Sequence, residues 1–283
     1  MTNFDRSYRF SAQPPGRPGF RIGEGSPMPL RISFKAEKSD TETPDTARIS
    51  IWNLNPEHLA ILMEKDCMTA LYAGYAQGGV SLVSAGPVVY AATAMDGGDR
   101  ETAMEIVDGR VPLRDTYVSM SYSGKVNTRA VIEDAAAAMG TALTFSHSAE
   151  FADLPCGFSF VGPARAALDK ACAATCLQWH IQNGVLQVKT RGGAMSREAY
   201  VLSADTGLVG IPRQFTYSED CAGGAERRGW EATYLMNGAI QVGDFVRLES
   251  RHVKGFFWAK RIEFSGDSMR GAWTATARLV HSA

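Results

Sequence analysis

The same order of strand patterns occurs twice in this chain, once in residues 32–120 and again in residues 194–283. In each copy a strand ends at an Asn-containing turn, a short alternating strand follows, a Gly introduces the next strand, and a β-rich strand closes the segment. The corresponding ranges are 51–54 and 234–237, 68–75 and 245–250, 86–90 and 255–258, and 102–107 and 273–280. The pattern predicts two small antiparallel β-barrels of one plan. Because few identities are shared, chance similarity of two small barrels stays open as the alternative.

Local signals place one short helix inside the first copy. Residues 47–54 alternate apolar and polar side chains and are rich in β-branched and aromatic residues, which favours a strand. Asn55 and Pro56 then supply a helix cap and a first helical residue. We expect this helix over 56–65. The polar stretch 38–45, which contains a Pro, is expected to form a hairpin-like connection.

Residues 121–193 have a different pattern, with helical periodicity in place of strict alternation. An Ala-rich run that stops at Gly140 predicts a helix, and a second apolar stripe at helical spacing predicts another. Asn183-Gly184 between two alternating stretches is a strong hairpin signal. The expected elements are helices over 128–139 and 165–176 and strands over 177–181 and 185–190.

These patterns predict an α+β, mostly β protein in which two small antiparallel β-barrels flank an αβ module. A Pro- and Gly-rich basic segment precedes the first barrel. The expected divisions are an arm over 1–31, a first barrel with one short helix over 32–120, the αβ module over 121–193, and a second barrel over 194–283.

The arm is the segment for which sequence favours contact with another subunit. Residues 14–19 (Pro-Pro-Gly-Arg-Pro-Gly) cannot sustain a helix, and five Arg against two acidic residues give the arm a charge of +3. Two interpretations of the arm stay open, a flexible terminus and a segment that becomes ordered against a neighbouring subunit. Interface candidates in the arm and on strand edges are Phe10, Arg17, Phe20, Arg21, Ile22, Trp52, Trp230 and Trp258.

Composition argues against several classes of function. The 29 Lys and Arg against 30 Asp and Glu give a net charge of −1, whereas a general nucleic-acid-binding protein is usually basic. The most apolar stretch, 82–95, is interrupted by Pro87 and is shorter than the ~20 residues that a membrane span needs. The N-terminus lacks a secretory pattern, and five scattered Cys are expected to be reduced thiols in a cytoplasm.

Sequence motifs for catalysis or cofactors are missing. Cys172, Cys176 and His180 lack a fourth zinc ligand nearby. Ser146-His147 has no nucleophile-elbow motif, and the Gly-rich stretch 74–79 has no phosphate-loop ending. We therefore expect no catalytic, cofactor-binding or metal-binding residues and a protein that is not an enzyme.

Several turn motifs resemble those of phage baseplate hub proteins, the late control protein D-like family. They are Asn53-Leu54-Asn55-Pro56-Glu57-His58-Leu59, Ala73-Gly74-Tyr75, the stretch 127–132 that leads the Ala-rich helix, 202–210, 235–237 with 243–244, and 253–256. The resemblance covers most of the chain beyond residue 30. Its motifs are turn residues between strands, and none is catalytic.

The resemblance implies a structural role in a virion. Three copies would form a pseudo-six-fold ring of tail-tube-like barrels that joins a six-fold tail tube to a three-fold spike. The implied partners are a second and third copy, the tail tube protein, the spike or needle protein and other baseplate proteins, with phage DNA passing through the lumen without specific binding. Assembly would take place in the host cytoplasm, and no cofactor is implied.

Two other functions stay open at this point. One is a tail-associated cell-wall hydrolase, which needs two carboxylates in a cleft. The other is a host-receptor-binding tail protein that uses exposed aromatic side chains such as Trp179 or Trp230.

Overall fold

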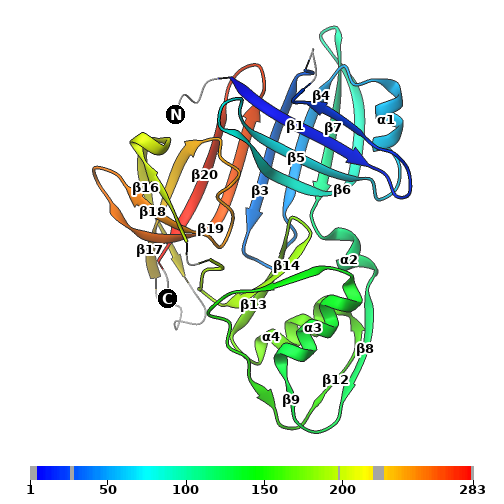
Figure 1. The fold of residues 1–283 in the computed structure, drawn as a ribbon, viewed down its shortest axis with the longest axis vertical. Coiled ribbons are helices and arrows are strands. Elements are labelled where there is room, and N and C mark those ends of the chain that lie inside the picture. The colour runs from blue at the N-terminus through cyan, green and yellow to red at the C-terminus, as the bar shows by residue number, and fades with distance from the viewer. Residues whose placement is uncertain (1–4, 26–28, 197, 219–225, 282–283) are drawn as a thin grey trace.

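Residues with alternating apolar and polar side chains form strands at both ends of the chain, and a module with the helices α2 (Arg110–Asp115), α3 (Thr128–Met139) and α4 (Ala164–Ala173) lies between them. The computed structural model describes residues 5–25, 29–196, 198–218 and 226–281. Figure 1 shows two sheet-rich barrels side by side and the middle module below them. The fold is α+β and mostly β, as the sequence predicts.

The first barrel contains seven strands and one short helix. Asn55 caps the helix through its side chain, which accepts a hydrogen bond from the Glu57 N–H, and Pro56 is the first helical residue. The helix ends at Leu62, three residues before the expected end. The elements are β1 Arg6–Gln13, β2 Phe20–Gly23, β3 Ile32–Ser39, β4 Thr46–Trp52, α1 Pro56–Leu62, β5 Met68–Tyr75, β6 Gly79–Asp96 and β7 Asp99–Val107.

The second barrel follows the middle module. It has six strands and one 3-10 turn, with no α-helix among its described residues. The elements are β15 Ala199–Ser203, η1 Ala204–Thr206, β16 Leu208–Ser218, β17 Glu226–Leu235, β18 Phe245–Glu249, β19 Lys254–Asp267 and β20 Trp273–Val280.

The two barrels repeat one strand topology. The hydrogen-bonded order is β1-β5-β6-β7-β4-β3 in the first and β15-β18-β19-β20-β17-β16 in the second, with the same order along the chain. The four correspondences expected from sequence fall on β4 and β17, β5 and β18, β6 and β19, and β7 and β20. The internal repeat is therefore confirmed. The copies differ at their first strands, since β1 is antiparallel to β5 whereas β15 is parallel to β18.

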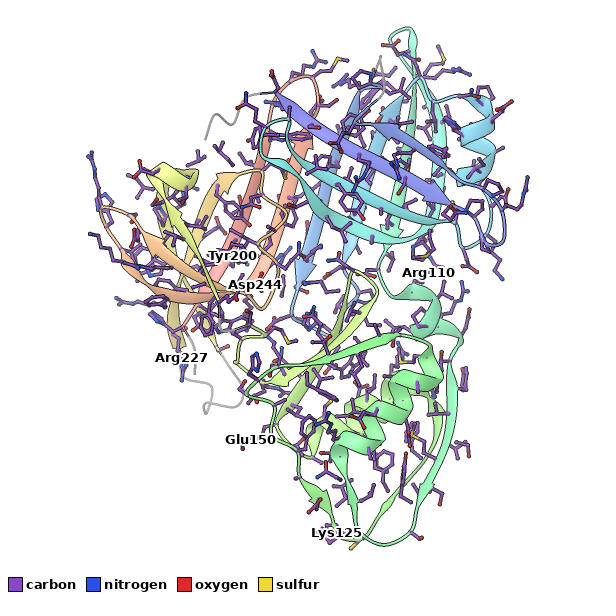
Figure 2. All side chains as sticks on the ribbon, in the orientation of Figure 1. Arg110, Lys125, Glu150, Tyr200, Arg227 and Asp244 are labelled. Atoms are coloured by element: carbon purple, nitrogen blue, oxygen red, sulfur yellow. The ribbon has the colours of Figure 1, made fainter. Side chains whose placement is uncertain are left out.

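The middle module has its own core. Helices α3 and α4 pack on one face of the sheet β10-β14-β13. Asn183 and Gly184 have positive φ at the β13–β14 turn, as the predicted hairpin requires. Figure 2 places Arg110 where the chain enters the module and Lys125 at the end far from the barrels. The elements are α2 Arg110–Asp115, β8 Tyr117–Tyr122, β9 Val126–Asn127, α3 Thr128–Met139, β10 Ala142–Phe145, β11 Asp153–Leu154, β12 Phe158–Pro163, α4 Ala164–Ala173, β13 Leu177–Gln182 and β14 Val185–Thr190.

The segment assigned to an arm is, over most of its length, part of the first barrel. β1 pairs with β5 over eight residues and with β2 over four. Tyr8, Phe10 and Ala12 point into the core because β1 alternates inward and outward side chains. The Pro-rich residues 14–19 form the connection between β1 and β2. The expectation of a separate arm is wrong for residues 6–23, since this chain's own sheet orders them.

Candidate assembly surfaces

Strand β3 of the first barrel pairs with β19 of the second, and this pairing joins the two barrels into one continuous sheet. Seven residue pairs connect the strands, from Arg261 opposite Ser39 to Asp267 opposite Ser33. On the polar face, Lys35 lies 3.2 Å from Glu263, and Arg261 donates to Glu37. We call this pairing the internal joint.

The core side of the internal joint is filled by two aromatic rings. Phe34 and Trp273 are buried and meet edge to face, with ring centroids 5.4 Å apart. Gly266 lies opposite both in the ladder, and a Cβ there would stand 2.5 Å from the Phe34 ring. Only glycine therefore fits between the rings. The Trp273 indole N–H also donates to the Gly74 carbonyl at 2.9 Å, which ties β20 to β5 of the other barrel.

Each barrel has both kinds of edge that form the internal joint, and one of each is unpaired. In the internal joint, the first barrel contributes strand β3 and the second barrel contributes the C-terminal half of β19. The equivalent strands are β16 and residues 88–96 of β6, and no described strand pairs with their outer edges. Both edges expose large apolar side chains, namely Val89, Tyr90, Met95, Val209 and Ile211.

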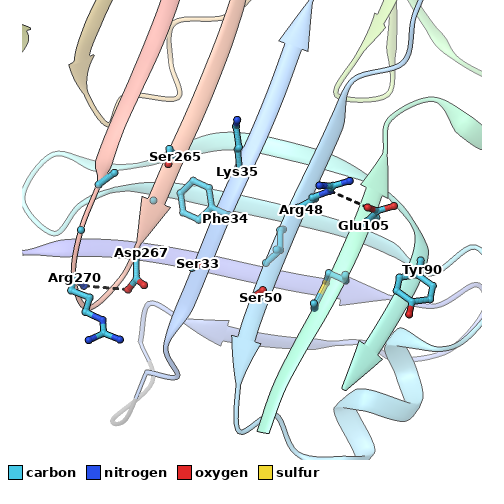
Figure 3. Close-up of a pocket in the computed structure, with 16 residues that line it drawn as sticks. Ser33, Phe34, Lys35, Arg48, Ser50, Tyr90, Glu105, Ser265, Asp267 and Arg270 are labelled. Carbon is cyan, nitrogen blue, oxygen red and sulfur yellow. Dashed lines mark hydrogen bonds and ion pairs between the residues drawn. The ribbon is translucent and has the colours of Figure 1, made fainter. Parts of the chain in front are cut away.

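The polar face of the continuous sheet runs across both barrels. Figure 3 shows a shallow pocket on this face, with Lys35 from β3, Arg48 from β4, Glu105 from β7 and Ser265 from β19. Arg48 lies 3.0 Å from Glu105. Farther along the face, Arg278 pairs with Glu231 at 3.2 Å. Since Lys35 and Arg261 are also paired, the charges on this face are largely neutralised within it.

A buried polar cluster fixes the middle module to both barrels. The Lys38 ammonium donates to Asn183 Oδ1 and Gln241 Oε1, at 2.8 Å each. Asp108 accepts from the backbone N–H groups of Asn183 and Gly184. Burial lowers the pKa of Lys38 to about 8 and raises the pKa of Asp108 to about 6. The cluster therefore holds the tip of the β13–β14 hairpin.

A second buried pair lies under the same hairpin. Lys189 is fully buried, with its Nζ 3.1 Å from Asp40 Oδ2 and 3.8 Å from the centre of the Trp258 ring. Gln178 donates to Asp40 at 3.1 Å. The stretch 38–45 forms the expected connection, but Lys38, Asp40 and Asp45 within it are buried, and Lys38 and Asp40 contact the module, whereas Glu42 stays exposed.

His180 lies on the same buried face of the hairpin, opposite Gln187. Its ring nitrogens have no hydrogen-bond partner in the described part of the structure. Burial, together with the nearby charge of Lys189, lowers the pKa of His180 to about 4, while Asp40 acts in the opposite direction. The imidazole is therefore neutral in the folded protein at pH 7.

This environment of His180 predicts an acid-sensitive fold. Below pH 6.5 the unfolded chain binds a proton that folded His180 excludes until about pH 4, so stability falls as the pH falls through this window. Between pH 6.5 and 4 the wild type should lose about 3 kcal/mol of unfolding free energy relative to His180→Gln. Urea unfolding of both proteins across this range measures the difference. Parallel pH profiles would contradict the prediction.

The structure buries four of the eight interface candidates and leaves the other four partly or fully accessible. Phe10, Trp258, Ile22 and Trp52 are buried within the chain's own core and are withdrawn as contact residues. Phe10 and Ile22 point into the first barrel, whereas Trp52 lies under the Arg31 guanidinium at 4.0 Å and donates to Asp96. Trp258 is covered by Lys189 of the middle module, 3.8 Å from its ring centre. The other four remain partly or fully accessible: Phe20 stacks on His58, Arg17 lies 2.6 Å from Glu64, Arg21 is exposed, and Trp230 is half-buried.

The aromatic residues considered for receptor binding are also largely covered. Trp179 is buried, and its indole N–H donates to Asp169 at 2.8 Å.

The cysteines that the structure describes are free thiols. Cys156 and Cys176 are exposed, Cys67 and Cys172 are buried, and Cys221 lies outside the described residues.

Two further searches cover only the part of the chain that the structure describes. Within it, no group of three or more His, Cys, Asp or Glu side chains is arranged to hold a metal ion. No helix there is long and apolar enough to cross a membrane.

No protein-family model and no curated protein sequence matches the chain. Solved structures do match it. A tail protein from Neisseria meningitidis MC58 has 12% identity and a TM-score of 0.63, with 96% of each chain covered. The 43 kDa tail protein of prophage MuSo2 from Shewanella oneidensis has 10% identity and a TM-score of 0.64, with 98% of this chain and 99% of the other covered.

A third match is an E. coli component of the type VI secretion system, described as structurally similar to the T4 tail proteins gp27 and gp5. It has 9% identity and a TM-score of 0.61, with 92% of this chain and 76% of the other covered. At these identities the similarity concerns the fold. The chain has the fold of phage tail proteins, and the resemblance to baseplate hub proteins is confirmed at that level.

Proposed function

We propose that this protein is a structural hub of a phage tail or a related particle, in which three copies form a ring of six barrels. The observation that carries the proposal is the repeat of one strand topology in both barrels. Two equivalent barrels per chain allow a trimer to match a six-fold tail tube on one side and a three-fold spike on the other. The fold shared with tail proteins supports this role.

The unpaired edges support a ring. Each chain forms the internal joint and leaves two different edges unpaired, β16 and residues 88–96 of β6. Because the two edges are of different types, the β16 edge of one copy contacts the β6 edge of the next, and the contacts between copies are head-to-tail. Head-to-tail contacts give a ring when the rotation closes. Pairing between copies also covers exposed apolar strand edges, which otherwise promote aggregation.

The polar face of the continuous sheet is proposed as the wall of the lumen. Four cations on this face, Lys35, Arg48, Arg261 and Arg278, are each paired with a carboxylate. Paired cations attract DNA phosphates weakly, so DNA passes without being held. The role is non-enzymatic, and the protein acts in the virion with the tail tube, the spike and other baseplate proteins as partners.

The mass of the purified full-length protein tests the ring. We expect native mass spectrometry to give three times the chain mass of 30.6 kDa, and particle images to show a ring with a central opening. A protein that stays monomeric at high concentration would rule the proposal out. Release of cell-wall fragments by the purified protein would instead favour the hydrolase.

A further inference from the structure

We propose that β16 of one subunit pairs antiparallel with residues 90–94 of β6 in the next subunit, with Gln214 opposite Thr93. This inference rests on the proposed ring and specifies the strands and the register of its subunit contact. It follows from treating the internal joint as the template for the joint between copies.

The first step equates β6 with β19. In its ladder with β7, β6 has a bulge between Val88 and Tyr90, and in its ladder with β20, β19 has a bulge between Ala259 and Arg261. Before the bulge β6 pairs with β5 and β19 pairs with β18. After it β6 pairs with β7, and β19 pairs with both β20 and β3. With the bulges aligned, Tyr90 is the counterpart of Arg261, and Thr93, three residues on, is the counterpart of Phe264.

The second step equates β16 with β3 through the strands between them. In the first barrel, Val88 lies opposite Ile106, which lies opposite Ala47, which lies opposite Ala36. The same path in the second barrel starts at the equivalent bulge and ends at Gln214. Its members are Ala259, Leu279, Trp230 and Gln214. Gln214 is therefore the counterpart of Ala36.

The two steps together fix the register. In the internal joint, Ala36 of β3 lies opposite Phe264 of β19. Replacing each residue by its counterpart places Gln214 opposite Thr93. The neighbouring pairs follow from antiparallel pairing. They are Tyr90 with Tyr217, Ala91 with Thr216, Ala92 with Phe215, and Ala94 with Arg213.

The side chains at this contact differ from those of the internal joint. Tyr90 takes the place of Arg261 in the contact between copies, and Phe215 takes the place of Glu37. Tyr90 is 60% exposed in the single chain, and Phe215 and Tyr217 are half-buried, with ring centroids 5.9 Å apart. Pairing would cover Tyr90 with the other two rings, which is a favourable cross-strand contact.

The occupant of each edge is a second copy of this chain. Within one chain the edges cannot meet, because β16 ends the strand order and β6 lies on the far side of β3, β4 and β7. The internal joint shows that an edge of the β3 type fits an edge of the β19 type. β16 and β6 are of these two types, and both are exposed.

Disulfide trapping in the full-length protein tests the register. The test variant carries Thr93→Cys and Gln214→Cys, both at exposed positions, in a background with Cys156, Cys176 and Cys221 changed to Ser. The control carries Thr93→Cys with Thr216→Cys, which lies on the same face two residues away. Directly opposite residues have Cα atoms within disulfide reach, about 4.4–6.8 Å, whereas diagonal residues lie beyond it.

After mild oxidation with copper phenanthroline, the test variant should run on a non-reducing gel as dimers and closed covalent trimers. The control and the single-Cys variants should stay monomeric on the same gel. A trimer in native mass spectrometry without this cross-link, or with equal cross-linking in the control, would overturn the register and leave the ring standing. Absence of any trimer would overturn both the register and the ring.

Discussion

Replacing Lys189 with Met is expected to lower the free energy of unfolding by about 3–5 kcal/mol. Lys189 is fully buried, and its ammonium is 3.1 Å from the equally buried carboxylate of Asp40. Without the ammonium, the Gln178 amide still donates to the Asp40 carboxylate at 3.1 Å, but a neutral donor does not compensate a buried charge. Urea unfolding of the variant and the wild type measures the loss.

A second variant separates the buried charge from the packing. In Asp40→Asn with Lys189→Met, the charge is removed together with its partner, so we expect most of the loss to be recovered. Arg48→Met is the exposed control. Its pair with Glu105 is largely solvated, and its removal should cost less than about 1 kcal/mol. A loss that small for Lys189→Met would contradict the prediction.

The repeat of the two barrels could be predicted because its signals are local. Alternation fixes which strands exist, and Gly or Asn residues mark the turns between them, so β5 and α3 begin and end at the expected residues. The αβ module was equally readable from its helical periodicity and the Asn183-Gly184 turn. In each case the deciding residues lie within a few positions of one another.

The strand β1 was missed for a different reason. Its alternation of Tyr8, Phe10 and Ala12 is present in the sequence, but residues 14–19 directed the interpretation toward an arm. The Pro-rich stretch breaks a helix, yet it also makes a suitable connection between two strands. The alternation was the better guide, because each inward side chain gains buried apolar area.

The joints and the buried cluster could not be read from sequence. Asp40 and Lys189 are 149 residues apart, and each resembles an ordinary surface charge within its own segment. The same holds for the pairing of β3 with β19, since alternation indicates a strand but does not identify its partner. Knowledge of which strands remain unpaired requires the complete topology.

Truncating Trp273 to Ala should weaken the internal joint, with a loss of about 3–5 kcal/mol in unfolding free energy. The indole packs against Phe34 across the joint, and its N–H donates to the Gly74 carbonyl of the first barrel. The variant therefore leaves a cavity beside Gly266 and an unpaired carbonyl. Urea unfolding, followed by circular dichroism, measures the loss.

Two matched variants determine whether the joint itself carries this effect. Trp273→Phe keeps most of the packing and removes only the hydrogen bond, so it should cost less than half as much. Trp179→Ala removes an equally buried indole, together with its hydrogen bond to Asp169, from the core of the middle module. If Trp179→Ala cost as much as Trp273→Ala, the loss would reflect indole burial in general. A larger loss at Trp273 would instead identify the contact between the barrels as the stabilising one, because this contact links the unfolding of the two barrels.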